Sequence, residues 1–366
     1  MTASPRPTAP IALLAFGALL SCGGSPPEYP SVDPDLREAR LELPTTPPRV
    51  ILDTDTGNEI DDQFALAYAL LSPALEVVGV HSAPYAFGGE LLSSPYFTSE
   101  LDARFLEAEI AERFGVSPEE VPELIRPRSS VRAARDAAQE IVDLCGSDLE
   151  VQMGSQAFVD LEAEPRESEA TRHLIEESFA APLTVVAMGA ITNVAEALRI
   201  DPTLALRITV VWVSAYPLTW DGPNASYNLA QDVDAFRVVL ESGVPFIYVP
   251  GFRVAEELRT NLGEMQSGVA GDSPLRTELF DLYEGHGFRD DHFARSKVLW
   301  DMAAVAVLAL PGSTASRVVR TPRLDEELIW APDGDGLPMR EVTDLHRDSI
   351  FADFFAVLDG YEPSSP

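Results

Sequence analysis

Four aspartates and one glutamate occur within ten residues of this sequence, directly after a short apolar run. They belong to the stretch RVILDTDTGNEIDDQFALAYALL, from Arg49 to Leu71. Alternate side chains of a strand share a face, so Asp53 and Asp55 are expected to point the same way. Asp61 and Asp62 then stand where a helix should begin, and a helix cap accounts for only one carboxylate. The remaining carboxylates require another explanation.

A metal ion is the explanation that the residue types favour. Carboxylates packed together raise one another's pKa unless a cation neutralises them. A set of oxygen ligands without His or Cys suits a hard cation, so the motif predicts Ca²⁺, with Mg²⁺ as the less favoured ion. An EF-hand is excluded, because the spacing lacks the closing Glu and the flanks are a strand and a helix.

The elements that must position these carboxylates are short apolar runs that alternate with helical patterns. The runs are RVILDTD, LEVVGVHSA, PLTVVAMG, RITVVWVSA and PFIYVPG. This alternation predicts an α/β fold with a doubly wound, mostly parallel sheet that is buried on both faces. Open sheets of this kind bind ligands at the carboxyl ends of their strands. A long acidic, helical insertion is expected between Gly89 and Ser130, and the globular domain is expected over residues 49–362.

The charge balance excludes some partners. The sequence has 366 residues, with 26 Lys and Arg against 59 Asp and Glu, a net charge of −33. Such a chain repels a phosphate backbone, so a nucleic-acid partner is not expected. The length and the 46% hydrophobic content allow one large domain with insertions. Homo-oligomerisation stays open.

The N-terminus predicts export. In MTASPRPTAPIALLAFGALLSCGGS, one arginine precedes the apolar stretch Ile11–Leu20, which is too short to span a membrane. The segment LLSC, which ends at Cys22, resembles the lipobox of bacterial lipoproteins. The resemblance implies removal of residues 1–21, a lipid on Cys22, and attachment at the bacterial cell envelope, on the outer membrane or the periplasmic face. An ordinary secretory signal is the alternative. Residues 22–48, rich in Pro and charge, predict a flexible tether.

Four motifs, in order between Arg49 and Pro311, resemble those of the inosine-uridine-preferring nucleoside hydrolase family. DTDTGNEIDDQFAL resembles the family's DTDxGxDDxxAL, with Asn58 and Glu59 as two additional residues. LTVVAMGAITNVAEAL resembles LVxxGPLTNIAxAL, PNASYNLAQDVDAF resembles EFNxxxDPEAA, and VLWDMAAVAVLALP resembles HDPxAVAxxLDP. A haloacid-dehalogenase-like phosphatase, the weaker alternative, accounts only for DTDTG.

This resemblance implies a Ca²⁺ site and a set of roles around it. The implied ligands are two aspartates of the first motif, one backbone carbonyl and the aspartate of the last motif: Asp55, Asp62, Met188 and Asp301. Asp55 would also be the general base for the attacking water. Asp61 and Asn228 resemble the residues that bind the sugar hydroxyls. Trp300 stands where many members have a proton-donating His, and it would stack on the base.

The sequence shows one further departure from the family pattern and several further candidates for the substrate pocket. Ser226 replaces a Glu that contacts the sugar in the family. The tract YEGHGFRDDHFARSK supplies His286, Arg289 and His292 as candidates for substrate contact or proton donation. Other candidates for the pocket border are His81 and Tyr85. Asn193 and Cys145 are expected to be structural.

The expected function is Ca²⁺-dependent hydrolysis of the N-glycosidic bond of a purine nucleoside or a related N-riboside, to free base and sugar. The partner is a small nucleoside-like molecule, and membrane contact is expected through the lipid anchor only. The alternative is a lipoprotein of the same fold that binds a nucleoside or sugar without turnover.

Overall fold

The computed structural model describes residues 28–85, 117, 127–224, 226–286, 293–331 and 336–361. The predicted signal peptide, Cys22 and most of the predicted insertion between Gly89 and Ser130 lie outside these ranges. Within the described ranges, no helix combines the length and the apolar character that crossing a membrane requires.

An eight-stranded sheet forms the centre of the molecule, in the order β3-β2-β1-β4-β5-β6-β12-β9. β9 pairs antiparallel with β12, and the other neighbouring strands are parallel. The strands are β1 Arg49–Thr54, β2 Glu76–Ser82, β3 Val151–Met153, β4 Leu183–Ala187, β5 Ile208–Ser214, β6 Phe246–Pro250, β9 Thr314–Arg320 and β12 Pro338–Leu345. The predicted doubly wound α/β fold is confirmed.

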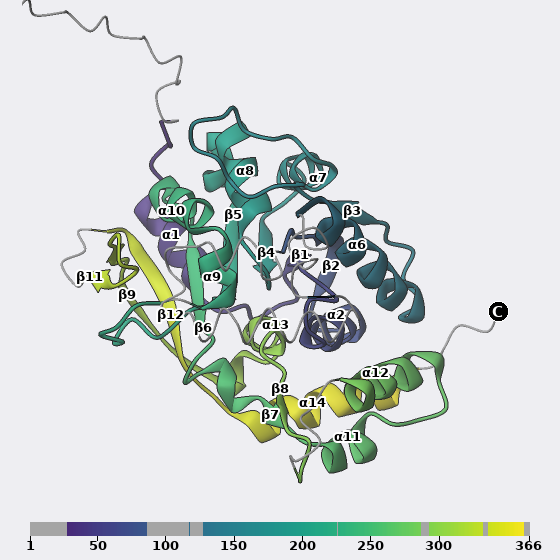
Figure 1. The fold of residues 1–366 in the computed structure, drawn as a ribbon. Helices are drawn as coiled ribbons and strands as arrows, with labels where there is room; N and C mark the ends of the chain where they lie inside the picture. Colours follow the sequence, from purple (N-terminus) through teal and green to yellow (C-terminus); the bar gives the residue numbers. More distant parts are fainter. Residues whose placement is uncertain are drawn as a thin grey trace, which may run out of the picture.

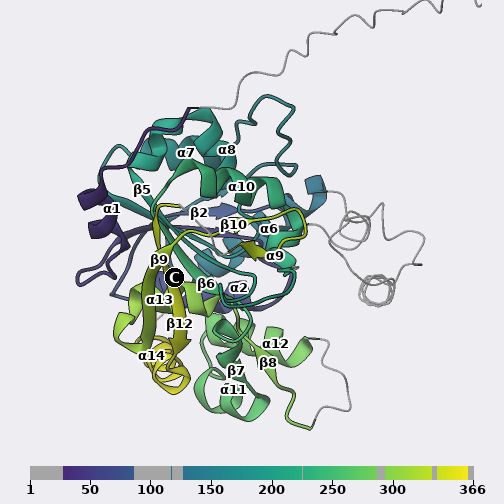
Figure 2. The same ribbon diagram turned by 90° about the vertical axis from the view of Figure 1, so that its left-hand side faces the viewer.

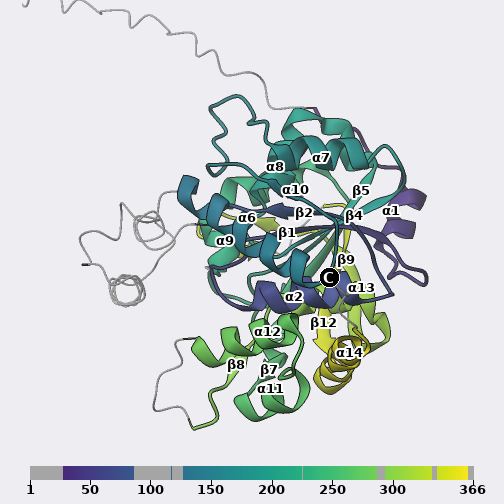
Figure 3. The same ribbon diagram turned by 90° about the vertical axis from the view of Figure 1, so that its right-hand side faces the viewer.

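Helices cover both faces of this sheet, as Figures 1, 2 and 3 show. They are α1 Pro34–Leu41, α2 Asp61–Leu71, α6 Pro127–Leu144, α7 Glu169–Glu177, α8 Thr192–Ile200, α9 Tyr227–Gln231, α10 Val233–Ser242, α11 Leu262–Gly268, α12 Pro274–Gly285, α13 Met302–Ala309 and α14 Arg347–Gly360. One apolar core contains residues of α2, α6, α12, α13 and α14, and a second contains residues of α7, α8 and α10. β5 lies between the two cores and is buried along its whole length, as its run of branched and aromatic residues predicts.

Two short antiparallel ribbons complete the described elements. β7 Arg259–Thr260 pairs with β8 Lys297–Val298 beside α11 and α12, and β10 Arg323–Leu324 pairs with β11 Trp330–Ala331. Cys145 follows α6 and is buried, as expected for a structural residue.

Part of the predicted tether is packed on the domain, which corrects that prediction for these residues. Pro34–Leu41 forms helix α1, whose N-terminus is capped by the carboxylate of Asp33. The side chain of Leu41 is 1% exposed, and the guanidinium of Arg37 donates to the carbonyl of Pro338 in β12 at 3.0 Å. The helix was not predicted, because its segment is rich in proline and charge and has little apolar periodicity. Only Arg37 and Leu41 are buried in it, and the aliphatic stem of Arg37 takes the place of an apolar side chain.

Candidate active site

A cavity of about 320 Å³ lies at the carboxyl ends of the central strands. Asp55 follows β1, Met188 follows β4, Ser214 ends β5 and Gly251 follows β6, and all four line this cavity. The strand order reverses between β1 and β4, and ligands of open α/β sheets bind at such a reversal. The topology therefore places the predicted carboxylates in a cavity suited to a ligand.

Three carboxylates meet in this cavity. Asp61, Asp62 and Asp301 are buried, and each has an oxygen atom within 4.8 Å of the other two. Asp61 and Asp62 begin α2, where the positive end of the helix dipole favours acidic side chains. Asp301 stands at the N-cap of α13, but its side chain makes no capping hydrogen bond. A helix cap therefore does not explain Asp301, which leaves its carboxylate for another role.

Burial of these three carboxylates disfavours their ionised forms. It raises the pKa of Asp61 to about 6 and the pKa of Asp62 to about 7, with repulsion from Asp61 as the second cause for Asp62. Burial, followed by repulsion from Asp61 and Asp62, also raises the pKa of Asp301 well above its usual range. The hydroxyl of Thr54 donates to Asp62 and partly offsets this effect.

Asp55 lies beside this cluster but outside the group of three. Burial, followed by repulsion from Asp62 and Asp61, raises its pKa well above the usual value. The backbone of Gly189 approaches so closely that a Cβ there would lie 2.8 Å from the Cγ of Asp55. On another side, Nδ2 of Asn58 donates to Oδ2 of Asp55 at 3.1 Å. The carboxylate of Asp55 is thus confined from two directions.

The carbonyl of Met188 is held in place between two strands. Nδ2 of Asn228 donates to this oxygen at 2.6 Å and to the carbonyl of Val213 at 3.1 Å. The backbone N–H of Met188 donates to the carbonyl of Asp53 at 2.8 Å. Asn228 lines the cavity, and it also joins the ends of β4 and β5.

The donor set fits a hard dication. Five carboxylate residues, Asp55, Glu59, Asp61, Asp62 and Asp301, line one cavity together with Met188, whose carbonyl is fixed, and all of these donors are oxygen atoms. The ammonium of Lys297 pairs with Glu59 at the edge of this set. Burial lowers the pKa of Lys297, but attraction to Asp61 and Glu59 outweighs it, so that the pKa is raised. One ammonium cannot balance the carboxylates of Asp55, Glu59, Asp61, Asp62 and Asp301, so a divalent cation suits the site.

Aromatic residues also line the cavity. Trp300 and Phe252 both line it, with ring centroids 5.5 Å apart and an angle of 56° between their planes. Phe252 stacks in turn on Tyr216, at 4.2 Å and 7°. Trp300 therefore lines the cavity, and an aromatic face is suited to contact a planar ring.

The comparison with protein families agrees with this geometry. The model of the family described as inosine-uridine preferring nucleoside hydrolase matches residues 123–329. The chain belongs to this family. The phosphatase alternative is set aside, because the family model accounts for more than half of the chain.

Relatives and solved structures are consistent with this membership in the nucleoside hydrolase family. Probable uridine nucleosidase 2 of Oryza sativa subsp. japonica is 27% identical over 237 residues, which cover 61% of this chain and 64% of the relative. The pyrimidine-specific ribonucleoside hydrolase RihB of Escherichia coli (strain SE11) is 26% identical over 205 residues, which cover 54% of this chain and 58% of the relative. The match thus spans less than two thirds of either relative.

Two solved structures of nucleoside hydrolases share the fold. The plant nucleoside hydrolase PpNRh1 superposes with a TM-score of 0.63 at 17% identity, covering 86% of this chain and all of that chain. The inosine-uridine preferring nucleoside hydrolase of Bacillus anthracis superposes with a TM-score of 0.61 at 15% identity, covering 85% of this chain and 98% of that chain.

Other predicted candidates divide into three groups. His286, at the end of α12, lines the cavity. Arg289 and His292 lie outside the described residues. His81 is buried and contacts His173, Nε2 to Nδ1, at 3.0 Å, and neither it nor Tyr85 is among the described residues that line the cavity.

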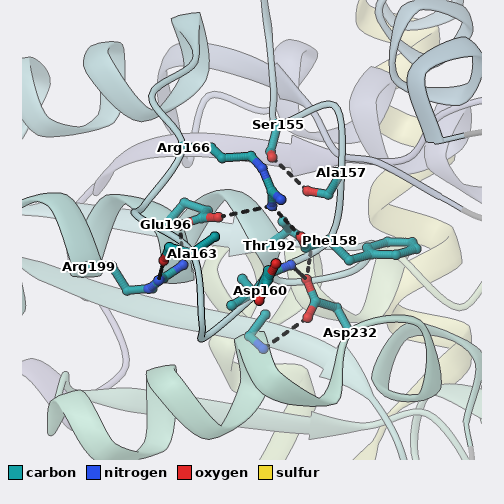
Figure 4. Close-up of polar contacts among 12 residues, drawn as sticks. Ser155, Ala157, Phe158, Asp160, Ala163, Arg166, Thr192, Glu196, Arg199 and Asp232 are labelled. Atoms are coloured by element: carbon teal, nitrogen blue, oxygen red, sulfur yellow. Dashed lines mark hydrogen bonds and ion pairs between the residues drawn. The ribbon is translucent and has the colours of Figure 1, made fainter. Parts of the chain in front are cut away.

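Asp232, the aspartate of the third motif, has a structural position. It caps α10 through the backbone N–H of Ala235, and it also accepts hydrogen bonds from the hydroxyl of Thr192 at 2.6 Å and from the backbone of Val159 at 2.9 Å. Figure 4 shows how these contacts, with a neighbouring cluster around Glu196, hold the loop after β3 against α8 and α10. Asp232 therefore supports the elements behind the site.

Asn58 and Glu59 are expected from the sequence to lie where the substrate would sit, whereas Tyr227 carried no functional expectation. Asn58 and Tyr227 line the cavity, and the Tyr227 hydroxyl donates to Oδ1 of Asn58 at 3.2 Å. The available signal was that both depart from the family pattern: Asn58 is inserted, and Tyr227 replaces a Phe.

Proposed function

We propose that this protein hydrolyses the N-glycosidic bond of a purine nucleoside or a related N-riboside, with Ca²⁺, to give a free base and a sugar. The observation that carries the proposal is a single cavity lined both by buried carboxylates and by Trp300. A nucleoside offers a partner for each kind of residue, because its sugar is rich in hydroxyl groups and its base is planar.

The residues that would hold the ion are Asp55, Asp62, Asp301 and the carbonyl of Met188, and Asp61 is close enough to compete for it. When bound, the ion would orient a water molecule and lower its pKa. Asp55 would accept the proton of that water as general base, a role that typically contributes about 10²–10⁴-fold to the rate.

The carboxylates also favour the bond-breaking step. Cleavage of an N-glycosidic bond passes through a transition state in which the sugar carries positive charge. Buried carboxylates beneath the sugar stabilise this charge more in the transition state than in the substrate. Asp61 and Asn228 would bind the sugar hydroxyls, and His286 at the cavity edge would protonate the leaving base.

The proposed preference for a purine base rests on Trp300. The relatives from rice and Escherichia coli are named for uridine and for pyrimidine ribonucleosides. Trp300 favours the larger purine ring, because stacking increases with the overlapping area. The assay must therefore include both classes of base.

The proposed location is the bacterial cell envelope, through a lipid on Cys22. The support is the resemblance of LLSC to a lipobox after a short apolar stretch. Expression in bacteria that receive a radiolabelled fatty acid tests it. Label on the chain that is lost in Cys22→Ser is the expected result, and equal labelling of both would overturn the proposal.

The test of the activity is release of base from inosine, guanosine, adenosine, uridine and cytidine, with Ca²⁺ and after chelation. We expect Ca²⁺-dependent release from at least one purine nucleoside and a loss of about 10²–10⁴-fold in kcat for Asp55→Asn. No release from any nucleoside, with Asp55→Asn indistinguishable from the natural chain, would refute hydrolysis of ribonucleosides.

One observation favours the binding-protein alternative. Ser226 stands in place of a glutamate, and its hydroxyl contacts the hydroxyl of Ser214 at 2.9 Å and accepts from the backbone N–H of Ala215 at 2.7 Å. The hydroxyl of Ser226 therefore forms hydrogen bonds within the protein and is not directed to a ligand. Calorimetry that detects nucleoside binding in the absence of turnover would select this alternative.

A further inference from the structure

The two residues inserted into the first motif are tied into the site. Asn58 is 7% exposed, and its Nδ2 donates to Oδ2 of Asp55 at 3.1 Å. Its backbone N–H donates to the carbonyl of Asp55 at 3.1 Å as well, in a turn that Gly57 permits with a φ of +89°. The inserted residue thus holds both the side chain and the backbone of Asp55.

The orientation of the Asn58 amide is set by Tyr227. The hydroxyl of Tyr227 donates to Oδ1 of Asn58 at 3.2 Å, so that the donor end of the amide faces Asp55. The reversed amide would place its oxygen against a buried carboxylate, which is repulsive. A phenylalanine at position 227, as in the family pattern, has no hydroxyl for this purpose. Two departures of this sequence from its family therefore contact each other.

The second inserted residue anchors the same turn to another part of the chain. Glu59 pairs with Lys297 of β8, whose side chain is 10% exposed. The turn between β1 and α2 is therefore fixed on one side by Tyr227 and on the other by Lys297. A turn held at both ends can impose one position on Asp55.

We propose that Asn58 is a positioning residue for Asp55, and that Tyr227 acts through Asn58 by fixing its amide. This inference rests on the proposed function, in which Asp55 holds the ion and accepts a proton. The amide of Asn58 holds one oxygen of Asp55, which would leave the other oxygen available to the ion and the water. Confinement by Gly189 on a further side leaves the carboxylate little freedom to turn.

The experiment compares Asn58→Ala, Tyr227→Phe and the double variant Asn58→Ala/Tyr227→Phe in the full chain. A hydrogen bond to a buried carboxylate corresponds to about 10–100-fold in rate, so we expect a kcat loss of that size for Asn58→Ala. KM should stay within about 3-fold, because Asn58 acts on Asp55 rather than on the substrate. Tyr227→Phe should lose less, and the double variant should match Asn58→Ala alone.

Tyr68→Phe is the matched control. This variant also removes one tyrosine hydroxyl that donates a hydrogen bond to another side chain, that of Asp353. Tyr68 lies on α2 and Asp353 on α14, and neither is among the residues that line the cavity. The kcat and KM of this variant should equal those of the natural chain. Thermal unfolding of every variant shows whether a loss of activity reflects a loss of folded protein.

The outcomes separate this inference from the proposed function. If the natural chain is active and Asn58→Ala keeps its kcat, or if the two single losses multiply in the double variant, the inference is wrong and the activity stands. A rise in KM with unchanged kcat would mean that Asn58 contacts the substrate instead. If the natural chain is inactive, Ca²⁺ binding by calorimetry and a crystal structure of Asn58→Ala decide. Unchanged Ca²⁺ affinity and an unmoved Asp55 would then overturn the inference.

Discussion

Asn193 at the start of α8 donates a hydrogen bond of 2.7 Å from Nδ2 to Oδ1 of Asp53 in β1. The same Nδ2 donates to the carbonyl of Ser82 at 3.0 Å, and Oδ1 accepts from the backbone N–H of Ser155 at 2.8 Å. One buried amide therefore connects β1, β2, the chain after β3 and α8 behind the active-site cavity. The expectation that Asn193 is structural is consistent with these contacts.

Replacement of this amide should be costly. We expect Asn193→Ala to lower the free energy of unfolding by about 2–4 kcal/mol, because several buried polar groups lose their partner. Denaturation by urea measures the change. Asn261→Ala is the matched comparison, since Asn261 caps α11 near the surface and its loss should cost about 1 kcal/mol. Equal costs for the two variants would contradict the prediction.

Gly189 gives a second prediction through its contact with Asp55. In Gly189→Ala the new Cβ would lie 2.8 Å from Cγ of Asp55, so the carboxylate must move. Displacement of a catalytic group by about 1 Å can cost roughly 100-fold in rate, which is the loss of kcat expected here. The control is Gly312→Ala, because a Cβ at Gly312 meets nothing within 4 Å. Full activity in both variants would show that Asp55 tolerates the displacement.

The carboxylate cluster predicts how pH and Ca²⁺ act together on stability. The pKa of Asp61 is raised to about 6 and that of Asp62 to about 7, above the value of about 3.9 for an unfolded chain. The folded chain then binds these protons more tightly, so their contribution to stability is present below about pH 4 and is lost as pH rises through about 6 and 7.

Calorimetry at several pH values tests this relationship. We expect the Tm of the chelated protein to fall from pH 5 to pH 8 relative to the Ca²⁺-loaded protein, because a bound cation favours the ionised carboxylates. The rise in Tm on adding Ca²⁺ should therefore be larger at pH 8. Asp62→Asn should reduce this dependence. The prediction fails if Ca²⁺ raises the Tm equally at both pH values.

Trp300 should contribute to substrate binding more than to folding. It is half-buried and faces the cavity beside Phe252. Stacking of a base on an aromatic side chain is worth about 1–3 kcal/mol, so Trp300→Ala should raise KM by roughly 5–150-fold. Trp300→Phe keeps a stacking face and should lose less. Steady-state kinetics with inosine and uridine would refute the prediction if KM changed for neither nucleoside.

Cys145 should be unreactive in the folded chain. Burial raises the pKa of its thiol to about 12, and the thiolate is the reactive form. In a Cys22→Ser chain, a disulfide reagent such as Ellman's reagent should react with Cys145 only after denaturant is added. Rapid reaction of the folded protein would show that α6 opens near its end.

Much of this architecture could be predicted from the sequence, for a definite physical reason. Parallel strands buried on both faces need continuous apolar runs, and such runs are visible without any knowledge of contacts. The place of Asp55 followed from the rule that ligands bind at the carboxyl ends of strands, whereas Met188 followed only from the resemblance of its motif to the family pattern. The local sequence pattern was sufficient to predict the position of a residue that directly follows a buried strand.

The membership of the carboxylate cluster could not be predicted in the same way. The group of three contains Asp61 in addition to the expected Asp62 and Asp301, while Asp55 lies beside it. The distance between Asp55 and Asp61 depends on the turn that Asn58 and Glu59 enlarge. Their partners are 169 and 238 residues away in the sequence, so no local pattern reveals them.

The pairing of Lys297 with Glu59 has a practical consequence for handling the protein. Lys297 is the only lysine of the sequence, and its ammonium is buried against a carboxylate. Reagents that modify primary amines will therefore find almost no side chain to acylate, and amine coupling to a sensor surface will be inefficient. Trypsin will cut almost entirely after arginine. Attachment chemistry for this protein should instead be directed to its many carboxylates.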